Sequence, residues 1–254
     1  MSCSTIMFSL FLMAPCPDGG GMEIPDAVAK AVSNPQRPTE DIAKDANRKP
    51  AEVLSFFNIE PGMTVLDIFS GGGYYTEMLN SIVGEDGKVI AHSNQAYMSF
   101  TGDAYEKRHA NGRLAHTETI VSELNDLELE QNSLDAAMLV LTWHDFMFAD
   151  PDNGWPAIDE ALLLDNLCSA LKPGGVLGLI DHAANSGAPA DETAKTLHRI
   201  DPQVVKDSFK DSCFSLEASA DFLANPDDDH SLSVFDKAIR GNTDRFVLRF
   251  VKNQ

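Results

Sequence analysis

The chain has 254 residues, of which 43% are hydrophobic, so it can bury a substantial core. Its 39 acidic residues outnumber its 19 basic residues, which gives a formal net charge of -20. A surface with this charge repels a phosphate backbone, so we expect no nucleic-acid partner. The length and composition predict one domain, which we place over residues 23–254.

The first 22 residues differ from the rest and predict a leader, or a degenerate signal-like segment. The apolar run Ile6–Ala14 is too short to cross a bilayer, so we expect no transmembrane anchor. The run has the length of the apolar part of a signal peptide, but no Lys or Arg precedes it. We therefore expect a cytoplasmic location, with a periplasmic or secreted protein as the alternative. Four cysteines form no disulfide framework in a chain of this length, and we interpret Cys168 and Cys213 as core residues.

In the folded part of the chain, the first expected elements are helices. Thr39, followed by two acids, is typical of a helix start, and Pro50 suits the first position of a second helix. Together they predict an N-terminal helical cap on a sheet. From there on, short apolar runs alternate with stretches compatible with helices. The runs predict strands at Val65–Ile68, Val89–Ala91, Thr119–Val121, Ala136–Leu141, Val176–Ile180, Phe214–Leu216 and Phe246–Val251.

The stretches between the strands set the expected fold class. We expect helices from the glycine cluster to Val83, over residues 97–109, and along the apolar stripe from Ile158 to Leu171. Strands that alternate with helices indicate a mainly parallel sheet covered on both faces. Loop residues, and no obvious long helix, separate the last two strands, which predicts antiparallel pairing at the sheet edge. The predicted fold class is α/β, a Rossmann-like sandwich with an antiparallel C-terminal edge strand.

The segment Val65–Gly73, with the sequence VLDIFSGGG, is the strongest candidate for a ligand site. It places an acid at the end of a strand and glycines in the following turn. Ligands of open α/β sheets bind outside the carboxyl ends of the strands, and glycines let a ligand approach the backbone. A glycine-rich turn alone is common, however, and Asp67 could simply anchor the loop or the helix.

The same segment resembles the first motif of class I S-adenosylmethionine-dependent methyltransferases, an acid followed by alternating glycines. Asp67, Gly71 and Gly73 occupy three of its four marked positions, and Phe69 replaces the first glycine. The resemblance implies that these four residues contact S-adenosylmethionine as the cofactor. Tyr74 follows the glycines directly, where its ring would either cover the ligand or pack under the next helix.

Two further landmarks of the family can be compared with this chain. LKPGGVLGLID, Leu171–Asp181, resembles the turn and fifth strand of these enzymes, and Pro173 with two glycines explains physically why a helix ends there. The second strand of the family usually ends in an acid that binds the ribose. Here VIAHSNQ provides only Asn94 as a candidate, so we assign the ribose contact to that residue.

A closer resemblance extends over most of the chain after residue 36. RKPAEVL, GGYYTE, the pair His144 and Asp145, HRID and VFDKAIRGNTDRFVLRF together resemble a bacterial group of predicted methyltransferases. That group often has exported members, and its methyl acceptor is undefined. The resemblance implies the fold and the cofactor more directly than the chemistry.

His144 and Asp145 are the candidate catalytic residues, because they follow the predicted fourth strand. Asp181 and His182 follow the fifth, so both pairs should lie at the same edge of the sheet. Methyl transfer requires alignment of the nucleophile and removal of its proton if it has one. His144 would act as the base or orient the acceptor, and Asp145 would fix its tautomer or bind the acceptor. The alternative is that His144 only satisfies a buried loop.

Imidazole and carboxylate groups also suit a divalent ion, and His198, Asp201 or His230 could complete such a site. No tightly spaced motif supports it, so we predict no metal. The leading hypothesis is a methyltransferase that acts on a small-molecule acceptor. The alternatives are a noncatalytic or degenerate S-adenosylmethionine-binding protein and a nicotinamide-dependent oxidoreductase, which the glycine pattern fits poorly.

Overall fold

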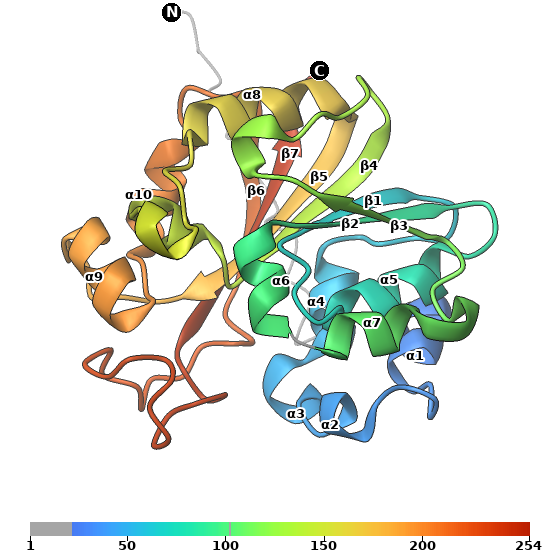
Figure 1. Cartoon of the computed structure of the whole chain (residues 1–254), viewed down its shortest axis with the longest axis horizontal. Coiled ribbons are helices and arrows are strands. Elements are labelled where there is room, and N and C mark those ends of the chain that lie inside the picture. The colour runs from blue at the N-terminus through green and yellow to red at the C-terminus, as the bar shows by residue number, and fades with distance from the viewer. Residues whose placement is uncertain (1–21, 102) are drawn as a thin grey trace, which may run out of the picture.

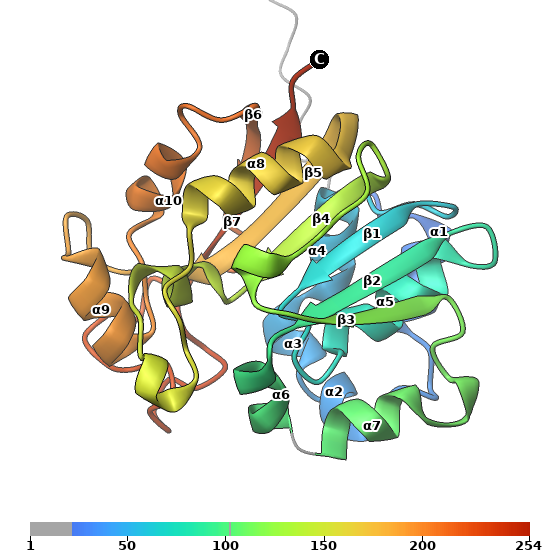
Figure 2. The same cartoon turned by 45° about the horizontal axis from the view of Figure 1, so that its top comes forward.

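A computed structural model describes residues 22–101 and 103–254 of the chain (Figure 1). The expected leader therefore lies almost wholly outside the described residues. The described part forms one seven-stranded sheet in the order β3-β2-β1-β4-β5-β7-β6, seen at an angle in Figure 2. The strands are β1 Thr64–Ile68, β2 Lys88–Ser93, β3 Thr117–Val121, β4 Leu134–Val140, β5 Leu171–His182, β6 Phe214–Ala220 and β7 Arg245–Lys252.

The first five strands are parallel, and the last one reverses direction. β1 lies between β2 and β4, so Asp67 pairs with Ala91 on one side and with Met138 on the other. β7 runs antiparallel to both β5 and β6, and it inserts between them. The predicted α/β class and the antiparallel C-terminal edge are thus confirmed. β6 is the outermost strand at that edge.

Ten α-helices connect or cover the strands in the described part of the chain. Thr39 and Pro50 begin helices as predicted, and the expected helix over 97–109 is divided into two, α6 and α7. Two helices between β5 and β6 were not predicted, because they are only eight and seven residues long. The helices are α1 Asp26–Val32, α2 Thr39–Ile42, α3 Asp45–Arg48, α4 Pro50–Phe56, α5 Tyr74–Val83, α6 Gln95–Thr101, α7 Asp103–His109, α8 Glu160–Ala170, α9 Ala190–Leu197 and α10 Pro202–Ser208.

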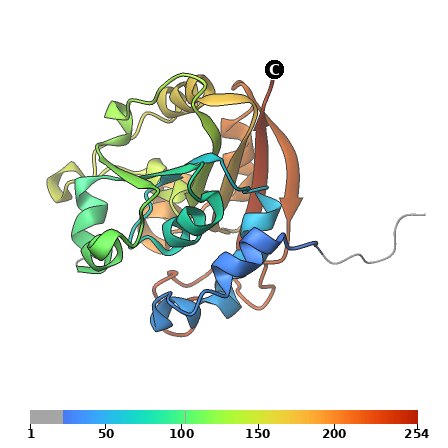
Figure 3. The ribbon, with the colours of Figure 1, turned by 90° about the vertical axis from the view of Figure 1, so that its right-hand side faces the viewer.

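Alternate residues of the strands fill two separate cores, one on each face of the sheet. Val65 packs with α1, α4 and α5, whereas its neighbour Leu66 packs on the opposite face with α8 and α10. Figure 3 shows α1 to α4 gathered on one side of the sheet. Because both faces are buried, the central strands are almost entirely apolar up to the point where they end. The polar residues of interest therefore cluster at those ends.

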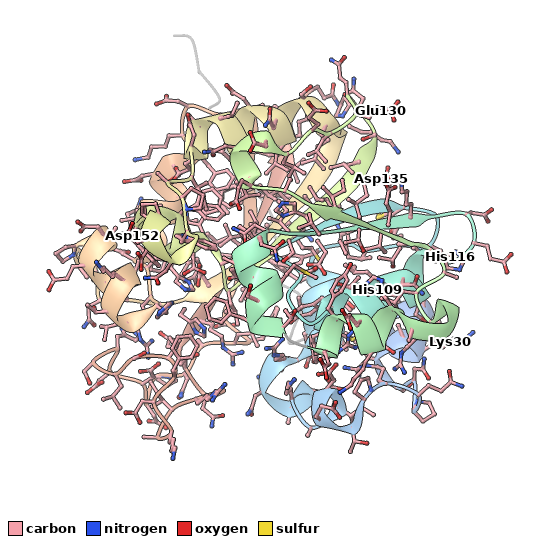
Figure 4. The ribbon with its side chains drawn as sticks, viewed as in Figure 1. Lys30, His109, His116, Glu130, Asp135 and Asp152 are labelled. Carbon is pink, nitrogen blue, oxygen red and sulfur yellow. A yellow bond between two sulfur atoms is a disulfide. The ribbon has the colours of Figure 1, made fainter. Side chains whose placement is uncertain are left out.

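The acidic side chains are spread over the surface. Glu130 and Asp152, labelled in Figure 4, project from different sides of the molecule. Within the described residues, we find no helix that is both long enough and apolar enough to cross a membrane.

Cys168 and Cys213 are joined by a disulfide between the end of α8 and the start of β6. Both cysteines pack against the core, as we interpreted them, but the disulfide between them was not predicted. Their sulfur atoms meet because α8 packs against the same face of the sheet that β6 extends.

Removing this disulfide should destabilise the fold. A link that closes a loop of 45 residues restricts the unfolded chain, and such links typically contribute about 2–4 kcal/mol. We expect Cys168→Ala/Cys213→Ala to lower the free energy of unfolding by this amount in a denaturant titration. A reductant should lower the stability of the wild type to the same extent and leave the variant unchanged. Equal sensitivity of both proteins to the reductant would contradict the assignment.

Candidate ligand-binding site

A cavity of about 310 Å³ opens where β1 and β4 end. Its walls come from the ends of β1 and β4, from the glycine loop, and from α2, α3, α5, α6 and α7. Asp67, Phe69, Gly71, Tyr74, Tyr97 and Thr142 are among its lining residues. The position agrees with the general location of ligands at the carboxyl edge of parallel sheets.

The glycine loop is open on one side and closed on the other. Gly71 has a φ of 57°, and a side chain there would start 3.9 Å from the Phe69 carbonyl oxygen, its nearest described neighbour. Gly73 has a φ of 78°, but a Cβ at this position would lie 2.6 Å from Cδ of Arg108. The first glycine therefore leaves space for a ligand, whereas the second makes room for an arginine.

Arg108 fastens α7 onto this loop. Its guanidinium donates to the Gly72 carbonyl oxygen and forms ion pairs with Asp41 and Glu77. All three charged side chains are at least nine-tenths buried. A buried group of this kind costs several kcal/mol if one partner is removed, so it holds the back of the loop firmly.

Phe69 replaces a glycine without blocking the cavity. Its φ is 51°, in the left-handed region that a glycine would adopt. The ring stacks on Tyr97 at 4.6 Å and lies 5.4 Å from the Trp155 ring, within the core beside α8. Phe69 is one of the residues that line the cavity, but the space beside Gly71 stays open.

Asp67 is a buried acid at the end of β1. The Thr76 hydroxyl donates to its Oδ2 at 2.6 Å, and no Lys or Arg pairs with it in the described chain. Because burial disfavours the charged form more than this bond favours it, the pKa of Asp67 is raised to about 6. The carboxylate thus serves as an anchor for α5, and it also lines the cavity.

Of the two other predicted cofactor contacts, Tyr74 and Asn94, only the first lines the cavity. Tyr74 lines the cavity, its hydroxyl donates to Asp45 at 2.6 Å, and the Arg48 guanidinium lies 4.5 Å from the centre of its ring. Asn94 is buried at the end of β2 and does not line the cavity. Its amide donates to Glu123 and its carbonyl oxygen accepts from the Tyr97 backbone, so it caps α6.

Two residues that line the cavity carry hydroxyls that are buried and, in the described part of the chain, unpaired. Ser70 Oγ and Thr142 Oγ1 find no hydrogen-bond partner within the described residues, and both residues line the cavity. An unpaired buried hydroxyl costs free energy, so both sites are destabilised locally. The space for a ligand is on the open side of Gly71.

His144 and Asp145 lie next to this cavity rather than in its wall. The hydroxyl of Tyr97, which lines the cavity, donates to Asp145 Oδ2 at 2.9 Å. His144 Nδ1 lies 2.7 Å from Asp181 Oδ1, and the His144 backbone N–H donates to Oδ2 of the same carboxylate. The structure therefore brings the predicted pair together with Asp181, and Tyr97 connects them to the cavity.

The environment of His144 is strongly anionic. Burial alone would lower the pKa of His144, but Asp181 and then Asp145 outweigh it and raise that pKa above its ordinary value. His182 behaves oppositely, because burial and the nearby cations lower its pKa well below the ordinary value. The two histidines at neighbouring strand ends thus favour different protonation states.

Sequence reasoning missed Tyr97 and Arg108, which close two sides of the cavity. Both lie on the short helices after β2, where no pattern marked an inward-facing residue. The only available signal was their position one helix after a strand end. Of the other proposed metal ligands, His198 lies close to Asp145, whereas Asp201 caps α10 and His230 pairs with Asp244.

Comparison with known proteins identifies the fold that carries this cavity. The family model described as protein-L-isoaspartate(D-aspartate) O-methyltransferase matches residues 32–114, which include β1, the glycine loop and β2. No curated protein sequence matches the chain. Among solved structures, a S-adenosylmethionine-dependent methyltransferase from Aquifex aeolicus aligns with a TM-score of 0.55 at 23% identity, covering 82% of this chain and 98% of its own. This chain has the class I methyltransferase fold.

Two further structures show the range of proteins with this fold. Geranyl diphosphate C-methyltransferase from Streptomyces coelicolor aligns with a TM-score of 0.58 at 13% identity, over 88% of this chain and 84% of its own. The [4+2]-cyclase SpnF aligns with a TM-score of 0.54 at 14% identity, over 84% and 80%. At these identities the alignments establish the fold alone, because one fold can carry different reactions.

The buried charge of Asp67 predicts a pH-dependent stability. The carboxyl pKa is about 6 in the fold, against an ordinary value of 3.8, so the ionised side chain destabilises the fold above pH 6. We expect Asp67→Asn to raise the free energy of unfolding at pH 7.5 by up to about 3 kcal/mol. The gain should shrink as the pH falls through 6 towards 4. Denaturant titrations at several pH values measure it.

Asp135→Asn is the matched control for this prediction. Asp135 also accepts a hydrogen bond from β1, at the Thr64 backbone N–H, but Lys172 pairs with it at 2.6 Å and it is partly exposed. Its replacement should give no gain in stability at pH 7.5. A loss of stability in Asp67→Asn at that pH would show that the ionised carboxylate is stabilising, which is the opposite of the effect expected from its burial.

Proposed function

We propose that the protein is an S-adenosylmethionine-dependent methyltransferase that acts on a small-molecule acceptor. The main support is the cavity at the end of β1, where the glycine loop leaves space beside Gly71. The fold and the partial match to a methyltransferase family model agree with this interpretation. The Streptomyces coelicolor C-methyltransferase, which has the same fold, was solved in complex with S-adenosyl-L-homocysteine.

The proposed cofactor contacts follow from the walls of the cavity. S-adenosylmethionine supplies an electrophilic methyl group on a sulfonium centre. The loop at Gly71 would accommodate the ligand closely, and Asp67 would accept a hydrogen bond or balance its positive charge. Tyr74 would provide a ring surface, Phe69 would form part of the wall beside Gly71, and Gly73 would act indirectly by leaving room for Arg108. Asn94 would support the site through α6, since both of its amide atoms are engaged.

His144 and Asp145 are the proposed acceptor-side residues. Tyr97 connects them to the cavity, and Asp181 fixes the orientation of the His144 ring. An acceptor held between this pair and the cofactor would have its nucleophilic atom aligned with the methyl carbon. The acceptor lone pair would form the new bond to carbon as the carbon–sulfur bond breaks, and any proton on the acceptor would pass to the site or to water.

A noncatalytic binding protein is the second candidate, and two observations favour it. Phe69 occupies a position where the family has glycine, and the usual ribose acid is absent. The [4+2]-cyclase also shows that the fold occurs in a protein with a different named activity. Such a protein would bind the cofactor without turnover on any acceptor.

Calorimetric titrations with S-adenosylhomocysteine, S-adenosylmethionine and NAD test the cofactor assignment. We expect the first two to bind and NAD to fail. Gly71→Val should weaken S-adenosylhomocysteine binding at least about tenfold, or 1.4 kcal/mol, because the branched side chain enters the open side of the loop. Preference for NAD, or no binding of any of the three ligands, would refute the proposal.

Gly174→Val is a suitable control for this variant. Gly174 has a φ of 79° and no described atom within 4 Å of a Cβ, but it lies near the start of β5, at the edge of the sheet opposite the cavity. Both variants therefore carry the backbone strain of a branched residue at positive φ. Only Gly71→Val should lose the ligand; a similar loss in Gly174→Val would indicate a general effect on folding.

His144→Gln tests the acceptor side. We expect S-adenosylhomocysteine affinity to change by no more than about twofold, or 0.4 kcal/mol. Turnover should fall about 100-fold, because a displaced positioning group misaligns the reactants. The assay follows formation of S-adenosylhomocysteine from S-adenosylmethionine with pooled small oxygen, nitrogen and sulfur nucleophiles. Equal losses of binding and turnover would argue against the role, and wild-type binding without any turnover would favour the noncatalytic candidate.

A further inference from the structure

Three side chains with metal-binding atoms converge beside the cavity, from two segments far apart in the sequence. His144 and Asp145 follow β4, and His198 ends α9. His144 Nε2 lies 3.3 Å from Asp145 Oδ1, and His198 Nδ1 lies 3.6 Å from the same oxygen. All three donor atoms fall within 4.8 Å of one another.

These separations match the spacing of ligands around a tetrahedral ion. A zinc ion binds imidazole nitrogen and carboxylate oxygen at about 2.0–2.1 Å, so neighbouring ligand atoms on a regular tetrahedron are roughly 3.3 Å apart. Two of the three pairs already have nearly this spacing. Two histidines and one carboxylate form a common ligand set for such ions, with a further position open.

The orientation of His144 supports this assignment independently of the distances. Its Nδ1 faces Asp181, a carboxylate with no exposed surface, which fixes Nδ1 as the N–H side and leaves Nε2 directed at Asp145. A carboxylate behind an imidazole is the usual outer partner of a metal-binding histidine. Tyr97 similarly donates to Asp145 Oδ2, so Oδ1 of that carboxylate is the one that faces both histidines.

His198 provides the third donor at some cost in backbone conformation. Its φ is 55°, an uncommon value for a residue other than glycine, and its backbone N–H closes the last turn of α9. Strained residues often mark functional positions. The side chain is 29% exposed, whereas that of His144 is 4% exposed, so an ion could reach the cluster from the His198 side.

We propose that His144, Asp145 and His198 bind a divalent transition ion of the zinc class, with at least one coordination position left open. The inference rests on these donor atoms and does not depend on methyl transfer. It reverses the prediction of no metal, which was made because the sequence spacing hides the contact between His198 and Asp145. A bound ion would occupy the Nε2 lone pair of His144. The ion, rather than the imidazole, would then contact an oxygen or nitrogen of the acceptor.

Zinc titration of protein without an affinity tag, first stripped with a chelator, tests the proposal. Excess Mg²⁺ is added to saturate the acidic surface, which offers only oxygen ligands. We expect one zinc ion per chain by calorimetry, and a visible absorption band when Co²⁺ replaces it. Asp181→Asn should weaken zinc binding about 10–100-fold, as loss of an outer carboxylate usually does. His198→Asn should weaken it further.

His230→Asn is the matched control. His230 also has a left-handed φ, of 63°, and pairs with a carboxylate, Asp244, at 2.9 Å, outside the cluster. Asparagine tolerates this backbone conformation, so both histidine variants should fold. Zinc affinity should be unchanged in His230→Asn, and S-adenosylhomocysteine affinity should be unchanged in both.

Three results would overturn the metal site. These are no zinc binding by the wild type under excess Mg²⁺, equal weakening by His198→Asn and His230→Asn, and full zinc affinity in His198→Asn. Any of them would leave the cluster as an ion-paired group that holds a proton on His144. Because the S-adenosylhomocysteine titration is separate, failure of the metal site would be distinguishable from failure of the proposed methyltransferase.

Discussion

The hydrogen bonds of Asp181 are the interaction on which the candidate site depends most. This carboxylate has no exposed surface, and it accepts from the His144 backbone, from the His144 ring and from the His182 backbone. It thereby fixes the segment after β4 against the end of β5. Thr142, which lines the cavity, lies two residues before His144 and is held by the same segment. Replacement of Asp181 would therefore disturb both the cavity wall and the histidine cluster.

Tyr97 lies between the cavity and the histidine cluster and contacts both. Its ring stacks on Phe69 at the cavity wall, and its hydroxyl donates to Asp145 in the cluster. A ligand that moved Tyr97 would alter the carboxylate that faces both histidines. On the opposite side, Arg108 holds the glycine loop through the Gly72 carbonyl oxygen. Binding at the cavity could therefore affect the cluster through one aromatic side chain.

The sequence allowed much of the fold to be predicted, because buried strands and glycine turns leave local patterns. β1, β4 and β5 lie where their apolar runs indicate, and Pro50 begins a helix. The contacts between distant segments could not be predicted in this way. The Cys168–Cys213 disulfide and the approach of His198 to Asp145 depend on how helices pack on the sheet. For Asn94 the sequence correctly indicated a position just after β2. It could not show that the amide is already engaged by Glu123 and by the Tyr97 backbone.

The replacement of glycine by Phe69 can be understood from competing free energies. A left-handed conformation costs a residue with a Cβ about 1–2 kcal/mol. Burial of a phenylalanine ring contributes about 1.5–3 kcal/mol, and stacking on another aromatic ring adds about 0.5–1.5 kcal/mol. Phe69 is 4% exposed and stacks on Tyr97, so the packing outweighs the strain. Because the same backbone conformation directs the ring into the core, the loop keeps a glycine-like path and the space beside Gly71 stays free.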